Sequence, residues 1–402
     1  MGEIRIEEQG RLTLPAEYVA RRGLGAGTRL VFEPIEDGLA LRFARPDARR
    51  AYIEVTARCN LNCAMCVRQV WRDAPGEMSW ETFQTVVEGL RAFLDPSGLS
   101  PSGRSLRRVT FGGFGEPLSH PRFPEMLALA AELEVGLTLT TNGLLLDETM
   151  AERLLDAHLD TVVISLDTVH VQAYQQARLA DGVDQVLNNL RQLQEMARAQ
   201  GRVPPRVGLE FVVMRSNLEW VEQLPGLAQQ LGASFVILSN LLPHTPELAA
   251  EILYDREEPL PLSGGWALKV GDWLLWGMVR APRMKWGAWR RCRFIEERAL
   301  VIGWDGGVSP CYALMHSYPY YIYGRRKEVS RYVLGNVREQ PLADIWSSEE
   351  YVRFRAKVRE MRFPSCVDCG MACTFAEDNE DCWGSVPSCA DCLWAQDIVR
   401  CP

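Results

Sequence analysis

The sequence predicts an α/β fold: a partial (β/α)6 barrel with a Cys-rich C-terminal extension and a small N-terminal β-rich module. Three observations lead to this prediction. Strand-like and helix-like segments alternate from residue 48 to about residue 242, short β-like segments precede them, and nine of the twelve cysteines follow residue 290. The 402 residues, 47% of them hydrophobic, are enough for two or three domains with cores of their own.

The overall charge and hydropathy narrow the function classes. The net charge of −8 argues against a general nucleic-acid-binding protein, because such proteins carry a basic surface. No stretch approaches the roughly 18 uninterrupted apolar residues of a membrane-spanning helix, and the N-terminus lacks the pattern of a secretory signal. We therefore expect a cytoplasmic chain with reduced thiols, whose clustered cysteines serve metal binding or catalysis rather than disulfides.

Residues 1–47 form the first predicted unit. Ile4 and Ile6 alternate with Glu residues, the run GRLTLP follows at 10–15, and a short helix is predicted over Ala16–Arg22. A closing hairpin is predicted from the apolar residues Leu30, Phe32, Leu39 and Leu41. This order resembles the swapped-hairpin module of the AbrB and SpoVT family, whose members dimerise and bind DNA. On an acidic chain the resemblance implies docking or a homodimer through 1–47 as readily as DNA binding, and a merely packed appendage is the remaining interpretation.

Residues 48–242 account for the predicted barrel, which is TIM-like. Strands are expected at Ala51–Val55, Arg108–Phe111, Gly136–Thr140, Thr161–Ser165, Arg206–Val213 and Ser234–Leu238. Amphipathic helices are expected between them, at Trp80–Leu94, Pro121–Glu132, Asp147–Ala157, Asp181–Ala199 and Glu219–Gln230. Such alternation gives parallel βα units with right-handed crossovers, and the carboxyl ends of the strands then form the functional face.

Residues 243–290 break this alternation and are predicted to connect the barrel to the extension at 291–402. Five tryptophans fall within them: Trp266, Trp273, Trp276, Trp286 and Trp289. We interpret these side chains as packing or interface residues. The wall of a substrate cavity or a partner surface is the alternative.

Three cysteines, Cys59, Cys63 and Cys66, stand directly after the first predicted strand. Three thiolates can hold three irons of a 4Fe–4S cube and leave the fourth iron open for a reactant, whereas structural zinc needs four closed ligands. The run Arg58–Cys66 resembles the signature of radical S-adenosylmethionine (SAM) enzymes. The resemblance implies that the three thiolates bind the cluster and that SAM chelates the open iron. Met65 departs from the family, which usually has an aromatic residue at this position.

Polar residues at the later strand ends fall where that family binds SAM. The run Phe111–Pro117 resembles its amino-group-binding motif, in which glycines allow close approach and Glu116 would accept a hydrogen bond from the ammonium group. The resemblance predicts SAM contacts from Gly112, Gly113, Gly115, Glu116, Thr141, Asn142, Ser165, Asp167 and Asn217. Ser165 and Asp167 are expected to bond the ribose or the carboxylate. Each polar strand end, taken alone, is equally well explained as a cap.

The C-terminal cysteines begin with Cys292 and Cys311, on either side of Gly306. The remaining seven are Cys366, Cys369, Cys373, Cys382, Cys389, Cys392 and Cys401. This arrangement resembles the SPASM extension of radical SAM enzymes, which carries two auxiliary 4Fe–4S clusters. It implies that Cys292 and Cys311 share one cluster with two tail thiols, that Cys366 and Cys369 belong to the other, and that one thiol is spare. The tail lacks the usual spacing, and zinc is the alternative, since paired C-x2-C knuckles also bind zinc.

The AbrB-like start, the run Cys59–Arg68 and the ending Cys382–Gln396 together resemble radical SAM maturases associated with tungsten-containing aldehyde oxidoreductases. The resemblance implies reductive cleavage of SAM to a 5′-deoxyadenosyl radical that modifies a protein, peptide or cofactor, with electrons from a donor such as ferredoxin or flavodoxin. A peptide-modifying SPASM enzyme that forms thioether or carbon–carbon crosslinks is the second hypothesis. A metal- or redox-sensing transcriptional regulator built on residues 1–47 is the third.

Overall fold

The computed structural model describes residues 8–22, 24–25, 28–35, 38–94, 105–166, 182–255, 279–280, 282, 285, 287–322, 324–366, 369 and 378–401. Three of the sequence predictions fall outside these ranges: the strand at Ile4 and Ile6, the SAM contact of Asp167 and the cluster ligand Cys373. Most of the Trp-rich segment also lies outside them, and its described part includes the helix α8 (Pro246–Glu251) and the 3-10 turn η5 (Gly287–Trp289).

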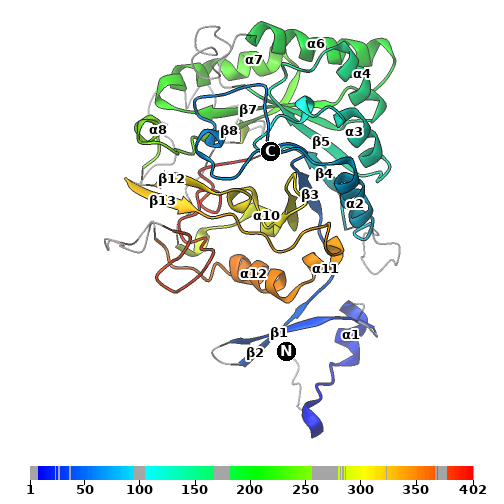
Figure 1. Cartoon of the computed structure of the whole chain (residues 1–402), viewed down its shortest axis with the longest axis vertical. Coiled ribbons are helices and arrows are strands. Elements are labelled where there is room, and N and C mark those ends of the chain that lie inside the picture. The colour runs from blue at the N-terminus through cyan, green and yellow to red at the C-terminus, as the bar shows by residue number, and fades with distance from the viewer. Residues whose placement is uncertain are drawn as a thin grey trace.

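A nine-stranded sheet runs through the molecule in the order β11-β10-β3-β4-β5-β6-β7-β8-β9 (Figure 1). Its central six strands are parallel neighbours in chain order: β3 (Arg50–Ile53), β4 (Arg108–Phe111), β5 (Gly136–Thr141), β6 (Thr161–Ser165), β7 (Arg206–Val213) and β8 (Ala233–Asn240). All six predicted strands are present. The predicted α/β fold with a partial barrel is confirmed.

Helices cover the outer face of these strands and form an arc in Figure 1: α2 (Trp80–Arg91), α3 (Phe123–Ala131), α4 (Glu148–Asp156), α6 (Val183–Ala199) and α7 (Leu224–Gln230). Side chains cap two of them at the N-terminus. The Ser79 hydroxyl accepts from the Thr82 N–H at 3.1 Å, and the Asp147 carboxylate accepts from the Met150 N–H at 2.8 Å. The helix predicted at Glu219–Gln230 is divided into a 3-10 segment, η4 (Arg215–Gln223), and α7, because Pro225 favours a helix start.

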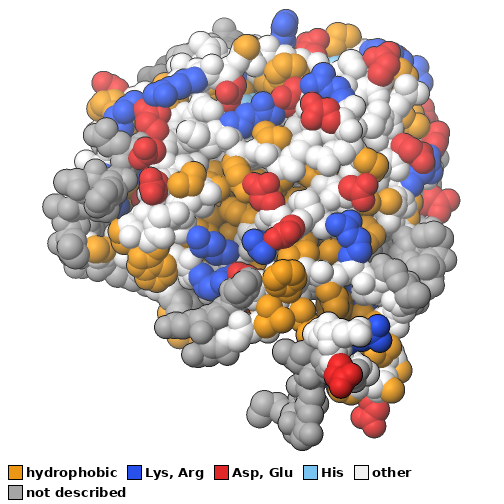
Figure 2. Space-filling view, turned by 60° about the horizontal axis from the view of Figure 1, so that its bottom comes forward, with side chains coloured by type: hydrophobic (Ala, Val, Ile, Leu, Met, Phe, Trp, Pro, Cys, Tyr) orange, Lys and Arg blue, Asp and Glu red, His pale blue; other side chains and the backbone are white. Residues whose placement is uncertain are grey.

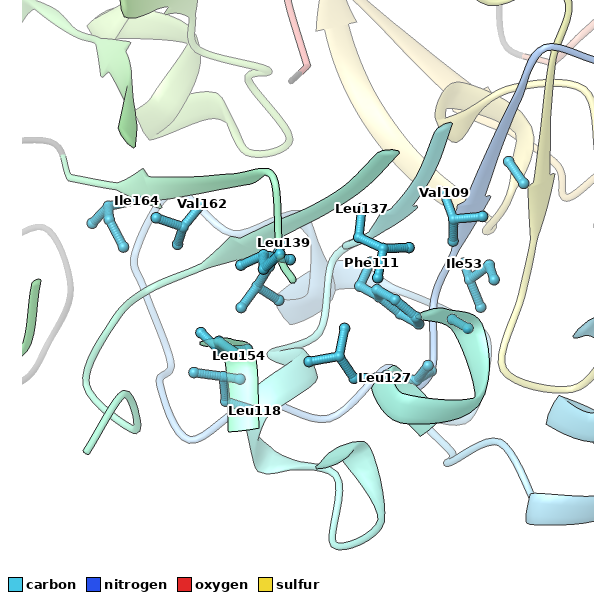
Figure 3. Close-up of a cluster of buried hydrophobic side chains, with 14 of the residues drawn as sticks. Ile53, Val109, Phe111, Leu118, Leu127, Leu137, Leu139, Leu154, Val162 and Ile164 are labelled. Carbon is cyan, nitrogen blue, oxygen red and sulfur yellow. The ribbon is translucent and has the colours of Figure 1, made fainter. Parts of the chain in front are cut away.

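The main core lies between the sheet and this helical layer (Figure 3). Ile53, Phe111, Leu139 and Val162 are register partners on four neighbouring strands, so they form one apolar row across the sheet. Leu118, Leu127 and Leu154 cover this row from the turn before α3, from α3 and from α4. Alternate residues point to the opposite face, where Tyr52 belongs to a second apolar cluster built from the C-terminal extension.

The C-terminal extension contains short strands. β10 (Ala299–Ile302) pairs in parallel with β3, β11 (Val308–Ser309) pairs antiparallel with β10, and β12 (Tyr318–Ile322) forms a hairpin with β13 (Arg325–Val329). A four-residue strand whose partner lies about 250 positions away leaves no periodic pattern to detect. The short strand β9 (Val279–Arg280) closes the far edge beside β8.

Helices complete the extension: α10 (Arg293–Glu296), α11 (Leu342–Trp346) and α12 (Glu349–Arg359), with the 3-10 turn η6 (Tyr312–Leu314). The Ser348 hydroxyl caps α12 at its N-terminus by accepting from the Tyr351 N–H at 3.3 Å. In the described part of the chain, no helix has both the length and the apolar character required to cross a membrane.

The N-terminal module projects from the body at the bottom of Figure 1. It contains the 3-10 turn η1 (Glu8–Gly10), the helix α1 (Ala16–Arg22) and the hairpin of β1 (Leu30–Ile35) and β2 (Gly38–Phe43), so the predicted helix and hairpin are confirmed. Ion pairs attach the hairpin to the end of α12. Arg42 lies 2.9 Å from Glu360, and Arg362 lies 2.7 Å from Glu33.

Candidate functional site

A cavity of about 250 Å³ opens at the carboxyl ends of the parallel strands. The loop after β3, the ends of β5 to β8 and the C-terminal tail all contribute to its wall. It contains Cys59, Cys63 and Cys66. It also contains six of the predicted SAM contacts: Gly113, Gly115, Glu116, Thr141, Asn142 and Ser165. The functional face is therefore at the end of the barrel that the sequence predicted.

The cysteine loop turns back on itself through the Cys66 N–H, which donates to the Cys63 carbonyl at 3.1 Å. Two N–H donors approach its sulfurs: Leu61 N–H lies 3.4 Å from Cys59 Sγ, and Arg68 Nε lies 3.3 Å from Cys66 Sγ. Burial raises the pKa of the Cys59 thiol to about 11. Three thiols beside an open cavity, with donors aimed at sulfur, fit a cube that is bound by three thiolates and has one open iron.

The glycine-rich loop after β4 requires glycine at two positions. Gly113 has a φ of +125°, and a Cβ there would lie 2.8 Å from the Glu54 side chain. A Cβ on Gly115 would lie 2.0 Å from the Thr56 carbonyl oxygen. This loop therefore packs its backbone directly on the strand that leads into the cysteine loop.

Glu116 fixes that loop to the neighbouring strand end. Its carboxylate accepts from the Thr141 hydroxyl at 2.7 Å, from the Asn142 N–H at 2.7 Å and from the Leu118 N–H at 3.0 Å. The side chain is 2% exposed. Protein donors thus use much of its accepting capacity, so Glu116 serves first to anchor the strand ends around the cavity.

Asn142 and Ser165 connect further parts of the cavity wall. The Asn142 amide donates to the Asn60 side chain at 2.8 Å and approaches Cys59 Sγ at 3.8 Å. The Ser165 hydroxyl donates to Glu210 on β7 at 3.2 Å. These contacts place a continuous polar surface from the cysteine loop across three strand ends.

Two of the predicted SAM contacts do not line the cavity. Gly112 lies beneath it, where a Cβ would meet the Tyr312 hydroxyl at 3.3 Å. Asn217 is used as a cap instead: its side-chain oxygen accepts from the Met214 N–H at 2.7 Å, and its amide donates to the Val212 carbonyl at 2.8 Å. The alternative interpretation of a polar strand end, as a cap, therefore applies to Asn217.

Sequence reasoning missed several cavity residues, among them Glu210, Ser239, Asn240, Tyr312, Trp394 and Arg400. Glu210 interrupts an apolar strand, and Ser239 and Asn240 end the sixth strand, so a polar residue at each strand end was a usable signal. The tail residues gave no such signal. They reach the cavity because Asn240 donates to the Ile398 carbonyl at 3.2 Å and the Arg400 N–H donates to the Ser239 hydroxyl at 3.0 Å.

Four thiols of the extension lie close enough to influence one another electrostatically: Cys292, Cys311, Cys389 and Cys392. They lie in the apolar cluster of Tyr52 or pack against it. Burial, followed by the charges of neighbouring thiols in this set, raises the pKa of Cys311 and Cys389 far above the usual value and that of Cys292 to about 12. Across the described ranges, no three His, Cys, Asp or Glu side chains are grouped as ligands of a single metal ion. Four neighbouring thiols have the number and kind of donors that a 4Fe–4S cube with four protein ligands requires.

The other described C-terminal thiols are Cys366, Cys369, Cys382 and Cys401, of which Cys366 and Cys401 also pack against the Tyr52 cluster. Cys366 and Cys369 are half-buried and Cys382 is exposed. Cys401 lines the cavity of the first cysteine loop, and its sulfur accepts from the Trp394 indole N–H at 3.1 Å.

Comparisons with known proteins agree with this geometry. Residues 53–223 match the model of the radical SAM superfamily, and residues 292–370 match SPASM, an iron–sulfur cluster-binding domain. A tungsten-containing aldehyde ferredoxin oxidoreductase cofactor-modifying protein from Pyrococcus furiosus is 36% identical over 356 residues, which cover 87% of this chain and 96% of that protein. A PqqA peptide cyclase from Granulibacter bethesdensis is 27% identical over 73% of this chain and 72% of its own length.

Solved structures share the fold. The structure of Streptococcus suis SuiB bound to S-adenosylmethionine superposes with a TM-score of 0.57 at 16% identity, over 82% of this chain and 71% of that one. The superfamily and domain matches imply a SAM-binding 4Fe–4S cluster and auxiliary iron–sulfur clusters. The cavity, the cysteine loop and the 36% identical relative lead to one conclusion: the chain is an enzyme of the radical SAM superfamily with a SPASM iron–sulfur domain.

Proposed function

We propose that this enzyme is a maturase of a tungsten-containing aldehyde oxidoreductase, which reductively cleaves SAM and uses the 5′-deoxyadenosyl radical to modify a protein, peptide or cofactor of that system. The observation that carries the proposal is the 36% identity to the Pyrococcus furiosus cofactor-modifying protein over 96% of that protein's length. The matched region covers 87% of this chain, which is more than the barrel or the extension alone.

The residues of the cavity would have separate roles in binding the cluster and SAM. Cys59, Cys63 and Cys66 would hold the first cluster, which when bound supplies an open iron for SAM and the electron for its cleavage. The backbone of Gly113 and Gly115 allows close approach of the methionyl group, and Ser165 with Glu210 offers hydrogen bonds to a ribose. Tyr312 and Trp394 form apolar wall, which excludes water from the radical.

The extension would hold two auxiliary clusters. We assign one to Cys292, Cys311, Cys389 and Cys392. The mutual electrostatic influence of these thiols supports this set, in which Cys292 and Cys311 share a cluster with two tail thiols. The second would use Cys366, Cys369, Cys373 and Cys382. Cys401 then becomes the spare thiol of the nine, because it lines the SAM cavity and is held by Trp394.

The test is made with anaerobically reconstituted protein, dithionite and SAM. We expect roughly twelve irons per chain, three cubes at four each, and formation of 5′-deoxyadenosine. Purified apo-oxidoreductase from a host that lacks this gene should gain activity on incubation with the enzyme, SAM and tungstate. Deoxyadenosine formation without any gain of oxidoreductase activity would leave the radical chemistry intact and reject the tungsten role.

A peptide substrate is the second candidate, favoured by the similarity to the PqqA peptide cyclase over 73% of this chain. A short Cys-rich peptide encoded beside this gene would then acquire a crosslink, seen as a loss of two hydrogens by mass spectrometry. The same assay on a peptide from the oxidoreductase system distinguishes the two candidates.

The remaining partners are proposed from the site and the module. A low-potential donor such as ferredoxin or flavodoxin would reduce the clusters, and the free thiols suit a reducing compartment, the cytoplasm. The hairpin of the N-terminal module supports a homodimer. One face of its two strands carries exposed apolar side chains, with Phe32 60% exposed opposite Leu41. Figure 2 shows hydrophobic side chains exposed toward the lower end of the molecule. The double variant Phe32→Ser/Leu41→Ser should be monomeric by light scattering if that face dimerises, and a DNA gel shift tests the regulator hypothesis.

A further inference from the structure

The turn that carries Cys389 and Cys392 is held by two buried cations. Arg290 is 2% exposed, and its guanidinium donates to the Ala390 carbonyl at 2.5 Å, inside the turn. Lys327 is 3% exposed, and its ammonium lies 2.5 Å from the Asp391 carboxylate in the same turn. Buried lysine and arginine are rare in proteins unless a structural or functional need retains them.

Arg290 also connects this turn to the segment that leads to the other thiols. Its guanidinium donates to the Phe363 carbonyl at 3.1 Å and to the Pro364 carbonyl at 3.0 Å, shortly before Cys366. Arg290 itself stands two residues before Cys292. One guanidinium therefore fixes backbone beside thiols on three separate stretches of the chain.

Lys327 reaches the turn from the β12–β13 hairpin, which Figure 1 draws beside the C-terminal segment. Tyr320 on β12 is the register partner of Lys327 on β13. A third cation on the hairpin, Arg325, lies 3.9 Å from the Asp391 carboxylate. The hairpin thus brings two cations to the single carboxylate of the Cys389–Cys392 turn.

The charged side chains around the Cys389–Cys392 turn form a shell whose charges favour a reduced cluster. Arg290, Arg325 and Lys327 are positive, whereas Asp391 and Glu296, which acts on Cys292, are negative, so these five charges are positive overall. A 4Fe–4S cube on four thiolates carries about −2 when oxidised and gains one more negative charge on reduction. In a buried setting, a fixed positive shell stabilises the added charge more than it stabilises the oxidised state.

We propose that Arg290 and Lys327 form a cationic clamp that holds the Cys389–Cys392 turn and raises the reduction potential of the cluster bound by Cys292, Cys311, Cys389 and Cys392. This inference rests on the proposed function, because it requires a cluster at those thiols. A raised potential makes that cluster an acceptor for the one electron that a substrate radical gives up on oxidation. The clamp residues tune the cluster and do not contact the substrate.

The experiment is a redox titration followed by electron paramagnetic resonance, on full-length protein carrying Cys59→Ala, Cys63→Ala and Cys66→Ala so that only auxiliary clusters contribute. In this background Lys327→Met should shift one midpoint potential downward, and Asp391→Asn should shift the same midpoint upward. The combined variant Lys327→Met/Asp391→Asn should return it toward the parent value. Arg326→Met is the matched control: Arg326 neighbours Lys327 on β13 but is half-exposed, so its loss should leave the potential unchanged.

Two further outcomes distinguish a failure of the cationic clamp from a failure of the proposed function. Complete absence of iron from the four thiols in the parent background rejects the cluster assignment itself. If iron is bound, midpoints that do not move, or that move in the same direction for Lys327→Met and Asp391→Asn, overturn the clamp. Should Lys327→Met lose its cluster, Lys327→Gln and Asp391→Asn at full iron content still give opposite shifts if the clamp is correct.

Discussion

Two sets of neighbouring cysteines in this enzyme differ in their surroundings more than in their chemistry. Cys59, Cys63 and Cys66 line an open cavity together with polar strand ends. Cys292, Cys311, Cys389 and Cys392 lie in or against an apolar cluster rich in tyrosine and valine. The first group has three thiols and room for a ligand, and the second has four thiols and a packed shell.

This difference separates reactivity from electron storage. A cluster with an open iron must border a cavity, because its reactant binds the metal. A cluster with four protein ligands needs no access, and an apolar shell with fixed charges controls its potential instead. Under the proposed assignment, cysteines serve two functions in this chain, and their surroundings decide which one.

The two regions are also joined mechanically through Glu54, at the end of β3. One oxygen of its carboxylate accepts from the Phe114 N–H at 3.1 Å, in the glycine-rich loop of the SAM cavity. The other oxygen lies 2.9 Å from His316 Nε2 in the extension. The sheet adds a second link, since β10 of the extension pairs with β3. The extension thus contacts the barrel directly, through a shared sheet and through the Glu54 carboxylate.

The largest expected effect comes from removing the three thiols that line the open cavity. Changing Cys59, Cys63 and Cys66 together to Ala should reduce the amount of 5′-deoxyadenosine to the level without enzyme. Among the described residues, Cys401 is then the one thiol left in the cavity wall, and a single thiol cannot hold a cube. Iron should fall from roughly twelve to roughly eight atoms per chain. Cys401→Ala is the matched control, since it lines the same cavity and should keep all the iron. Turnover that survives the triple change would contradict the assignment.

Removing Cys311, one of the four thiols of the extension, should affect iron content and stability but not SAM cleavage. Cys311→Ala should lower iron by about four atoms and lower the free energy of unfolding by several kcal/mol, because metal binding contributes to folding and a buried side chain is lost. Uncoupled SAM cleavage with dithionite should persist. Thermal denaturation, iron analysis and deoxyadenosine assays measure the three quantities. An unchanged melting temperature at reduced iron content would show that the closed group does not stabilise the fold.

Glu116→Gln tests the anchor of the open site and should have a smaller effect. The change removes the charge of an acceptor that binds three donors, and hydrogen bonds to charged groups contribute about 1.5–3 kcal/mol. We expect kcat/KM for SAM cleavage to fall about 10- to 100-fold, mainly through KM. Thr141→Ser keeps the hydroxyl donor and is the conservative control, with near-parental kinetics. Loss of iron in Glu116→Gln would instead make Glu116 a support of the cysteine loop.

The cavity at the strand ends could be predicted from the sequence to a greater extent than the set of four thiols in the extension. Cys59, Glu116 and Asn142 follow strands that local periodicity identifies, and parallel strands bring their carboxyl ends together by topology alone. The pairing of Cys292 with Cys389 depends on how a long tail folds back, which no local pattern encodes. Cys401 and Arg400 reach the cavity by the same route. Asn217 shows the converse limit, because a cap and a ligand have the same appearance in a sequence.

The smallest effect is expected from deleting residues 1–47, because neither thiol group includes any of their side chains. The described contacts of the hairpin with the body include ion pairs between partly exposed residues, such as Arg42 with Glu360, and pairs of this kind contribute about 0–1 kcal/mol each. Uncoupled SAM cleavage and iron content should therefore stay at the parental level. The deletion should change only the oligomeric state or the modification of the macromolecular substrate. A loss of SAM cleavage would place the module in the active site and remove the distinction between the reactive cavity and its surroundings.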